Sequence, residues 1–471
     1  MIPFEDHFSL SANDLQAALE LSLSRGGDFA DLFLEYRIYS FINMEEDIIK
    51  ETAESVSLGM GIRVNSGEKT GYGYTNDLAL EEIRKAALSA AAVVSSGKPM
   101  TPSPLKAVPV TSDAYPLLDP AHLAGLERKI ALVKEAYSAC RRFDTRIKKT
   151  KASLQDHVQY MLVANSEGLL VRDARPLVKL VVTAIAEKGE RREYGYAGGG
   201  GRTGLEEFGD GEAARSLGRE AALEALNLLE AVEAPAGEMP VVLAPGHSGV
   251  LVHEAVGHLL EADFIRKKTS IFHDKLGKKV GSPLVSIVDD PTIPSFRGTY
   301  NVDDEGTPAR KTVLIDRGVV VSVLTDRLSA RLMRRDQTGH GRRQDFSCIP
   351  IPRMANTYIE PGRDAPEDIL RSVRKGIYAE RYEGGQVEDS GKFTFSVSSG
   401  HLIESGKLTA PIKQATLIGS NIDILQNIEM VGSDLSFGLQ TGTCSKEGQD
   451  VPVTDGCPTL KISRITVGGQ S

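Results

Sequence analysis

The chain has 471 residues, 41% hydrophobic and 25% charged, which is ordinary for a globular protein of two or three domains. Its net charge of −9 argues against general binding to nucleic acid or anionic membranes, because both need a basic surface. Residues 1–14 lack the basic and apolar regions of a signal peptide, and no apolar run of about 18 residues occurs. We therefore expect a cytoplasmic protein that binds neither nucleic acid nor membranes.

The first part of the chain follows a helix, strands, helix order. A helix is predicted over 11–26, with Ser11 suited to the N-cap position. An alternating strand over 30–40 and two strand-like runs around the turn at 65–67 come next. An Ala-rich helix over about 79–96 completes the module.

A second module of the same order follows the Pro-rich stretch 97–110, a candidate linker. The dense glycine tract 194–204 matches no phosphate-binding loop, and we expect a mobile loop there. These modules form a predicted N-terminal α+β domain over 1–236, with a break near 97–112. The second module is predicted to contain a helix over 119–143, strands over 147–156, 158–164, 168–173 and 177–187, and a helix over 211–231.

The second half, 237–471, is predicted to be a β-rich catalytic domain that begins after the boundary-like stretch 230–240. Its runs are mostly strand-like, and the Gly-containing turns at 316–318 and 404–406 indicate hairpins. One helix near its start carries two histidines. The predicted fold class is therefore α+β, with the candidate metal-binding helix in the C-terminal half.

That helix contains the sequence LVHEAVGH, in which His253 and His258 are five residues apart. Zinc-protease helices carry H-E-x-x-H, whose histidines are four apart and share one face. At about 100° per residue, a spacing of five separates the two side chains by about 140° on a regular helix. A π-helical turn, or a loosened helix at Gly257, would bring them together, and we favour the π turn. Otherwise they are one core and one surface histidine.

A catalytic zinc site keeps three protein ligands and one open position, so a third ligand is needed. Near the histidines the candidates are Glu261, Asp263 and His273; far along the chain Cys444 lies in a polar segment, whereas Cys348 and Cys457 look structural. Spacing leaves the choice between Cys444 and Glu261 open. In the H-E-x-x-H arrangement, a glutamate placed like Glu254 is the general base that activates a metal-bound water.

Several motifs resemble one family, the PmbA/TldD proteins, once called modulators of DNA gyrase. The TldD branch carries H-E-x-x-x-H, which is intact in this chain, and the PmbA branch lacks it. The similar segments are GMGIRVNSGEKTGYGYTNDL (59–78), HEAVGHLLEADF (253–264), DDEGTPA (303–309), IPRMANTYIEPG (351–362) and TGTCSKEGQ (441–449).

This resemblance implies a zinc-dependent metallopeptidase that cleaves flexible or unfolded peptides. By matched position it implies His253, His258 and Cys444 as zinc ligands and Glu254 as the base. It also implies a dimer, either a homodimer or a heterodimer with a PmbA-like paralogue. The peptide is expected to bind as an added strand, and 393–406 is our candidate for the receiving edge.

Two charged segments are not part of the predicted site, and one alternative function fits the same metal ligands. The Arg-rich stretch 331–345 is expected to be a solvated loop, and the acidic run 303–305 a structural turn rather than a cation site. The alternative function is a non-catalytic scaffold or binding subunit with a structural metal, which would not need a base at Glu254.

Overall fold

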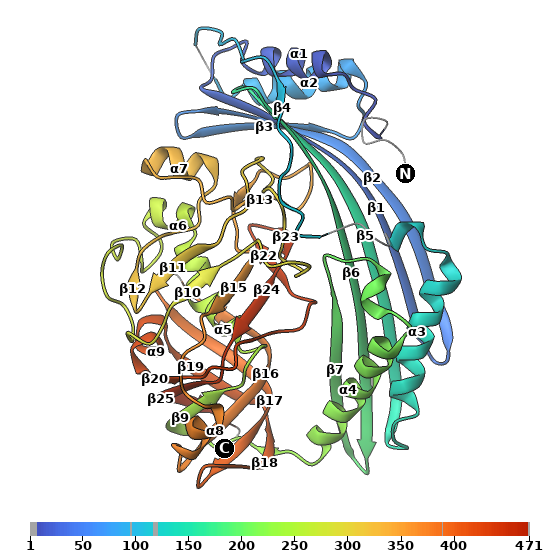
Figure 1. The fold of residues 1–471 in the computed structure, drawn as a ribbon, viewed down its shortest axis with the longest axis vertical. Coiled ribbons are helices and arrows are strands. Elements are labelled where there is room, and N and C mark those ends of the chain that lie inside the picture. Colours follow the sequence, from blue (N-terminus) through green and yellow to red (C-terminus); the bar gives the residue numbers. More distant parts are fainter. Residues whose placement is uncertain (1–6, 95–96, 116–120, 389, 470–471) are drawn as a thin grey trace.

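The computed structural model describes residues 7–94, 97–115, 121–388 and 390–469. Figure 1 shows a long curved sheet along one side of the molecule and a β-rich half packed against its concave side. The architecture is α+β, as predicted. Among the described residues, no helix is both long and apolar enough to cross a membrane.

The N-terminal half contains two modules of one helix, three long strands and a second helix, which confirms the repeated order. β1 and β5 pair antiparallel from Asp31↔Asn165 to Glu45↔Lys151 and join the modules into one sheet, in the order β3-β2-β1-β5-β6, with β7 and the short β4 both on β6. The elements are α1 Ala12–Ser22, β1 Phe29–Glu45, β2 Ile48–Ser66, β3 Lys69–Thr75, α2 Leu80–Ala91, β4 Lys106–Ala107, the 3₁₀ turn Ala121–Leu123, α3 Leu126–Arg141, β5 Ile147–Asn165, β6 Leu169–Lys188, β7 Arg191–Gly201, the 3₁₀ turn Leu205–Phe208 and α4 Glu212–Leu229.

Strand alternation separates the two faces of this sheet. On β1, Leu32 and Leu34 pack with α1 and α2, and Ile42 packs with α3 farther along the same face. Phe33 points the other way and packs with Val302 of the C-terminal half. Both helix pairs therefore cover one face, and the opposite face receives the C-terminal half (Figure 1).

Several predicted boundaries in this half were wrong. The strands expected over 147–156 and 158–164 form one strand, β5, and those over 168–173 and 177–187 form β6. Local pattern suggested breaks, but continuous pairing with neighbouring strands carries each strand through them. Of the predicted helices, residues 95–96 and 119–120 lie outside the described residues.

We expected the glycine tract to be a mobile loop, and this was wrong. Its residues 194–201 form the greater part of β7, which pairs with β6 from Val178↔Gly201 to Lys188↔Arg191. A Cβ on Gly195 would lie 2.1 Å from the carbonyl oxygen of Ala221 in α4, and one on Gly198 2.6 Å from Thr441. The glycines therefore allow a helix and a C-terminal segment to approach the strand closely.

The C-terminal half is built on two larger sheets. Strands β16, β9, β25, β19 and β17 pair in a closed ring, because β16 also pairs with β17, while a second sheet has the order β12-β11-β10-β15-β24-β21. The elements are β8 Val232–Glu233, β9 Gly237–Leu243, α5 Gly249–Val252, the π-helical turn His253–Gly257, the 3₁₀ turn His258–Leu260, α6 Ala262–Lys267, β10 Ile287–Asp289, β11 Thr312–Asp316, β12 Val319–Val320, α7 Arg327–Met333, β13 Gly341–Arg342, β14 Ile351–Pro352, β15 Asn356–Ile359, α8 Pro366–Arg371, β16 Lys375–Val387, β17 Lys392–Glu404, β18 Lys407–Lys413, β19 Ala415–Ser420, α9 Asn421–Asn427, β20 Ile428–Val431, β21 Ser436–Phe437, β22 Thr443–Lys446, β23 Gln449–Pro452, β24 Thr454–Cys457 and β25 Leu460–Gly468.

Two expectations in this half were wrong and one was right. The segment 393–406 is not an edge, because β17 pairs with β16 on one side and with β18 and β19 on the other. The stretch 331–345 is not simply solvated, since Arg342 and Arg343 are buried. The run 303–305 is a structural turn, in which Asp303 accepts hydrogen bonds from the backbone amides of Glu305 and Thr307.

The close packing of β7 on α4 gives a test. Gly195→Ala is expected to destabilise the protein by about 1–3 kcal/mol, because its Cβ meets the α4 backbone. Gly199→Ala, four residues on, is the control, since its Cβ would lie 3.4 Å from Leu217, an ordinary contact, and should change stability by less than about 0.5 kcal/mol. Urea unfolding of both variants measures the difference, and equal losses would contradict the packing argument.

Candidate metal centre

The two histidines lie on a helix that changes its winding between them. After the short α-helix Gly249–Val252, residues His253–Gly257 form a π-helical turn, and a 3₁₀ turn begins at His258. The wider turn takes up one extra residue, so side chains five apart face the same direction. The predicted π turn is therefore confirmed.

Cys444 approaches the same place from β22, far along the chain. β22 and β23 form a two-residue hairpin whose turn residues, Glu447 and Gly448, both have positive φ. Strand alternation buries Cys444 and Lys446 on one face and exposes the residues between and beside them. The hairpin thus directs a thiol and an ammonium group together towards the helix.

The donor atoms of His253, His258 and Cys444 all lie within 4.8 Å of one another, and Cys444 Sγ is 3.2 Å from His258 Nε2. Two imidazoles and a thiol are ligands that zinc prefers, and three protein donors leave a position for water or substrate. The chemistry of the donor set therefore fits a catalytic zinc ion. Of the nearby alternatives, Glu261 and Asp263 bind Lys446, and His273 Nδ1 lies 2.9 Å from the carbonyl oxygen of Ser270.

Each histidine has a carboxylate at its other ring nitrogen. His253 Nδ1 lies 2.7 Å from Asp455 Oδ1, and His258 Nδ1 lies 3.0 Å from Glu261 Oε2. Such carboxylates orient metal-binding imidazoles and make them better ligands. Asp455 is well placed because α5 packs closely on β24, where a Cβ on Gly249 would lie only 2.4 Å from the backbone nitrogen of Gly456.

Electrostatics favour the ligand form of the thiol. Burial opposes ionisation of Cys444, but the adjacent His258 and His253 outweigh it and hold the thiol pKa well below its usual value. Burial likewise opposes charge on His258, yet Glu261 and Cys444 raise its pKa to about 10. A thiolate is the form that binds metal, and a bound cation would take over the role of the imidazolium charge.

Glu254 borders this group without belonging to it. Its carboxylate oxygen Oε2 lies 3.9 Å from His258 Nε2, and its side chain is 34% exposed. It is thus close to the donors and open to solvent on one side. A carboxylate so placed can exchange a proton with a water molecule beside the three donors.

Behind the histidines lies a buried ion cluster that sequence reasoning recognised only in part. Lys446 Nζ contacts Glu261 at 2.9 Å and Asp263 at 2.8 Å, and all three side chains are buried. Glu261 had been weighed as a ligand, whereas Lys446 and Asp455 had no assigned role. Alternation along β22 could have indicated that Lys446 shares the buried face with Cys444. No local sequence pattern indicates that Asp455 contacts His253.

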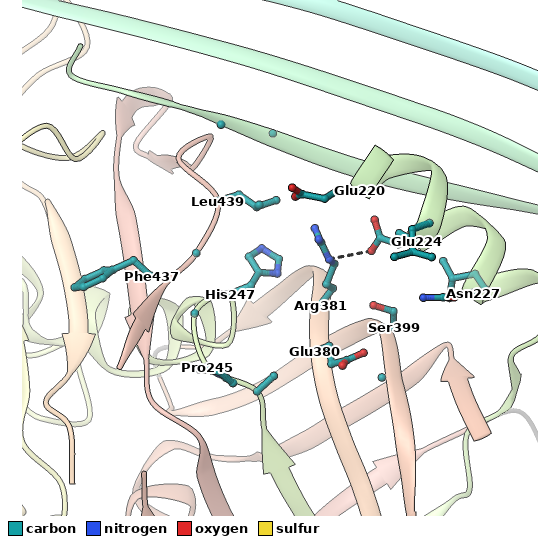
Figure 2. Close-up of a pocket in the computed structure, with 18 of the residues that line it drawn as sticks. Glu220, Glu224, Asn227, Pro245, His247, Glu380, Arg381, Ser399, Phe437 and Leu439 are labelled. Atoms are coloured by element: carbon teal, nitrogen blue, oxygen red, sulfur yellow. Dashed lines mark ion pairs between the residues drawn. The ribbon is translucent and has the colours of Figure 1, made fainter. Parts of the chain in front are cut away.

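A cavity of about 650 Å³ lies between the two halves, and its lining does not include the three donor residues or Glu254. Figure 2 shows Glu220 and Glu224 of α4 facing Arg381 of β16, with His247 pointing into the space between. Arg381 Nε pairs with Glu224 at 3.1 Å. His247 precedes α5, and Asp455 acts electrostatically on it as it does on His253. Asp455 therefore links the donor group to the cavity lining: it contacts His253, and its carbonyl oxygen accepts a hydrogen bond from the amide of Gly438 at the cavity wall.

Three comparisons bear on this site. Family models described as PmbA/TldA metallopeptidase domain 1, central domain and C-terminal domain match residues 30–94, 120–229 and 236–469. A Haemophilus influenzae protein named metalloprotease TldD homolog is 43% identical over 98% of this chain and 97% of its own. A Saccharolobus solfataricus protein named zinc metalloprotease TldD homolog is 33% identical over 52% of this chain and 54% of its own. The fold is similar to TldE from Thermococcus kodakarensis, with a TM-score of 0.76, 18% identity, and coverage of 98% and 100%.

The ion cluster behind the histidines gives a second test. Lys446→Met leaves Glu261 and Asp263 buried without their cation, so we expect a loss of about 3–5 kcal/mol. Lys267→Met is the matched control: this half-exposed lysine lies 3.9 Å from Glu447, and its loss should cost less than about 1 kcal/mol. Urea unfolding of the metal-free proteins compares them. Similar losses in both variants would show that the buried cluster is not needed.

Proposed function

Because the chain belongs to the PmbA/TldD metallopeptidase family, we propose that it is a zinc-dependent peptidase that cleaves flexible or unfolded peptides, with Glu254 as its general base. One observation carries the proposal: two histidines and a cysteine from distant segments converge, with a part-exposed carboxylate 3.9 Å from one of them. Both the donors and the base are thus available in one place.

The chain's own residues divide the chemistry between them. Held by His253, His258 and Cys444, a zinc ion would act as a Lewis acid and lower the pKa of the attacking water. Glu254 takes a proton from that water as its oxygen adds to the peptide carbonyl carbon. The same carboxyl group then gives the proton to the amine nitrogen as the C–N bond breaks. Asp455 and Glu261 keep the two imidazoles oriented.

The surroundings favour an extended peptide as substrate. The cavity of about 650 Å³ is lined by both halves of the chain and has acidic groups from α4. β17 cannot receive an added strand, but β22, which carries Cys444, pairs only with β23 in the described part of the chain. A strand added there would place main-chain carbonyls beside the donors, and folded segments would not fit this arrangement.

A partner chain is part of the proposal. We infer a dimer, formed either with a second copy or with a PmbA-like paralogue, in keeping with the family to which the chain belongs. The likeness to TldE concerns the fold, and the choice between the two kinds of dimer stays a prediction.

Metal content tests the ligand set. Cys444→Ser and His258→Ala are each expected to lose most of the bound zinc, because two remaining donors hold the ion far more weakly. Cys348→Ser is the matched control, since this half-buried cysteine lies outside the donor group and should leave the zinc content unchanged. Elemental analysis of the purified proteins gives the result. Full zinc retention by both ligand variants would refute the site.

The role of Glu254 is tested separately from the metal. Glu254→Gln should keep its zinc but lower kcat on an unfolded polypeptide such as denatured casein by about 10²–10⁴-fold, because it removes the base. Glu447→Gln, an exposed glutamate in the β22–β23 turn, serves as the control. Unchanged cleavage by Glu254→Gln would instead favour a non-catalytic scaffold with a structural metal.

A further inference from the structure

A second cavity, of about 310 Å³, lies between the concave face of the N-terminal sheet and the C-terminal half. Among the described residues, six arginines from both halves line it, against two carboxylates, Asp304 and Asp450. The arginines are Arg37, Arg175, Arg202, Arg297, Arg342 and Arg343. So strong an excess of positive charge is unusual in a chain whose net charge is −9.

Four of these arginines form no ion pair with a carboxylate among the described residues; one of them, Arg343, donates to the hydroxyl of Tyr72 and to the backbone carbonyls of Cys348 and Asp304. Arg202 donates to the carbonyl oxygens of Thr299 and Pro176, and Arg297 Nε donates to that of Gly442 at 2.6 Å. Arg342 donates to two further backbone carbonyls. Their side chains are at least nine-tenths buried, and Arg297 Nη1 is buried with no hydrogen-bond partner.

Two other buried arginines, one of them at the cavity wall, do pair with carboxylates. Arg63 lies 2.7 Å from Glu305 and also pairs with Asp31, and Arg175 Nη1 lies 2.6 Å from Asp304. A buried guanidinium normally requires such a partner, because carbonyl dipoles do not neutralise its charge. The unpaired arginines are therefore an exception that the fold itself does not explain.

The unpaired charges also act on one another. Burial, and then neighbouring arginines, lower the pKa of Arg202 to about 9 and that of Arg297 to about 10. Burial, followed by Arg37, Arg202 and Arg297, keeps the pKa of His157 well below its usual value. Any anion placed among these groups would relieve this repulsion.

We propose that this arginine-lined cavity is a binding site for a small oxyanion, of the phosphate or carboxylate type, held by Arg202, Arg297 and Arg342. A planar guanidinium group can donate two parallel hydrogen bonds to two oxygens of one oxyanion, which a halide ion cannot accept in the same way. The volume suits a single anionic group and excludes a folded partner. Thr443 and Asp450 at the cavity wall are exposed, which leaves a route from solvent.

The proposed anion site borders β22, the strand that carries Cys444. Thr443 lines the cavity, and the next residue in β22 is Cys444. Arg297 binds the carbonyl oxygen of Gly442, so a bound anion would contact the arginine that holds the start of this strand. The ligand can be a free anion or the carboxylate of an acidic peptide segment, and the second source rests on the proposed peptidase function.

Inorganic phosphate is the first probe, added to the full-length chain at constant ionic strength in chloride buffer. We expect phosphate to raise Tm by several degrees, and calorimetry to show binding that Arg297→Gln weakens at least tenfold. Without phosphate, Arg297→Gln should be no less stable than the parent, because it removes an unneutralised charge. Arg202→Gln is a second variant if the first does not fold.

Arg141→Gln is the control, since this arginine also donates to a backbone carbonyl, that of Ile147 at 2.7 Å, and forms no ion pair in the described part of the chain, but lies outside the cavity. It should bind phosphate as the parent does.

The second probe is a flexible Glu-containing peptide and its Gln analogue, with binding measured in the Glu254→Gln background so that neither is consumed. An Arg297-dependent preference for the Glu peptide, with phosphate competing, identifies the substrate as the source; phosphate binding without competition identifies a free anion.

The proposal is overturned if neither phosphate nor the Glu peptide binds, or if Arg297→Gln and Arg141→Gln affect binding equally. Because binding and stability are measured without cleavage, these outcomes do not depend on whether the chain is a peptidase. If the parent chain binds phosphate but does not cleave peptides, the result would count against the proposed function alone.

Discussion

The site depends on one constraint, the five-residue spacing of His253 and His258. On a regular α-helix these side chains diverge by about 140°, so a shared metal is possible only if the backbone takes up one extra residue. The π turn does this, and packing retains it: a Cβ on Gly257 would lie 2.0 Å from the sulfur of Met354, so the wide turn is pressed against the strand region that follows β14. A turn less favourable than an α-helix persists where its neighbours leave no alternative.

The third donor is positioned by contacts that are independent of the helix. Arg353, fully buried, binds the carbonyl oxygen of Cys444, and Lys446 two residues later binds Glu261. Since Glu261 also meets His258, the hairpin and the helix are joined twice, once through the donors and once behind them. Protein contacts therefore support the donor group from both segments, and the same carboxylate serves both the ion cluster and the imidazole.

Sequence reasoning succeeded where the determining interactions are local. The N-cap at Ser11, the hairpin turns and the π turn all follow from residues within one or two turns of each other. It failed where distant segments decide the outcome. The glycine tract looked mobile because its partner, α4, lies elsewhere in the sequence, and 393–406 looked like an edge because neither neighbouring strand is marked locally. Spacing alone could not choose Cys444 over Glu261; only the resemblance to a family favoured it.

The interface between the halves explains why charged residues were the hardest to interpret. Arg342 and Arg343 seemed suited to solvent, yet the interface buries them, whereas Arg331, Arg334 and Arg335 are exposed. Arg63 with Glu305, and Arg381 with Glu224, join the halves by directional ion pairs. Such pairs add little net stability once desolvation is counted, but they fix the relative position of the surfaces more narrowly than apolar contacts do. Because the cavity of about 650 Å³ has walls from both halves, that fixed position also determines the shape of the cavity.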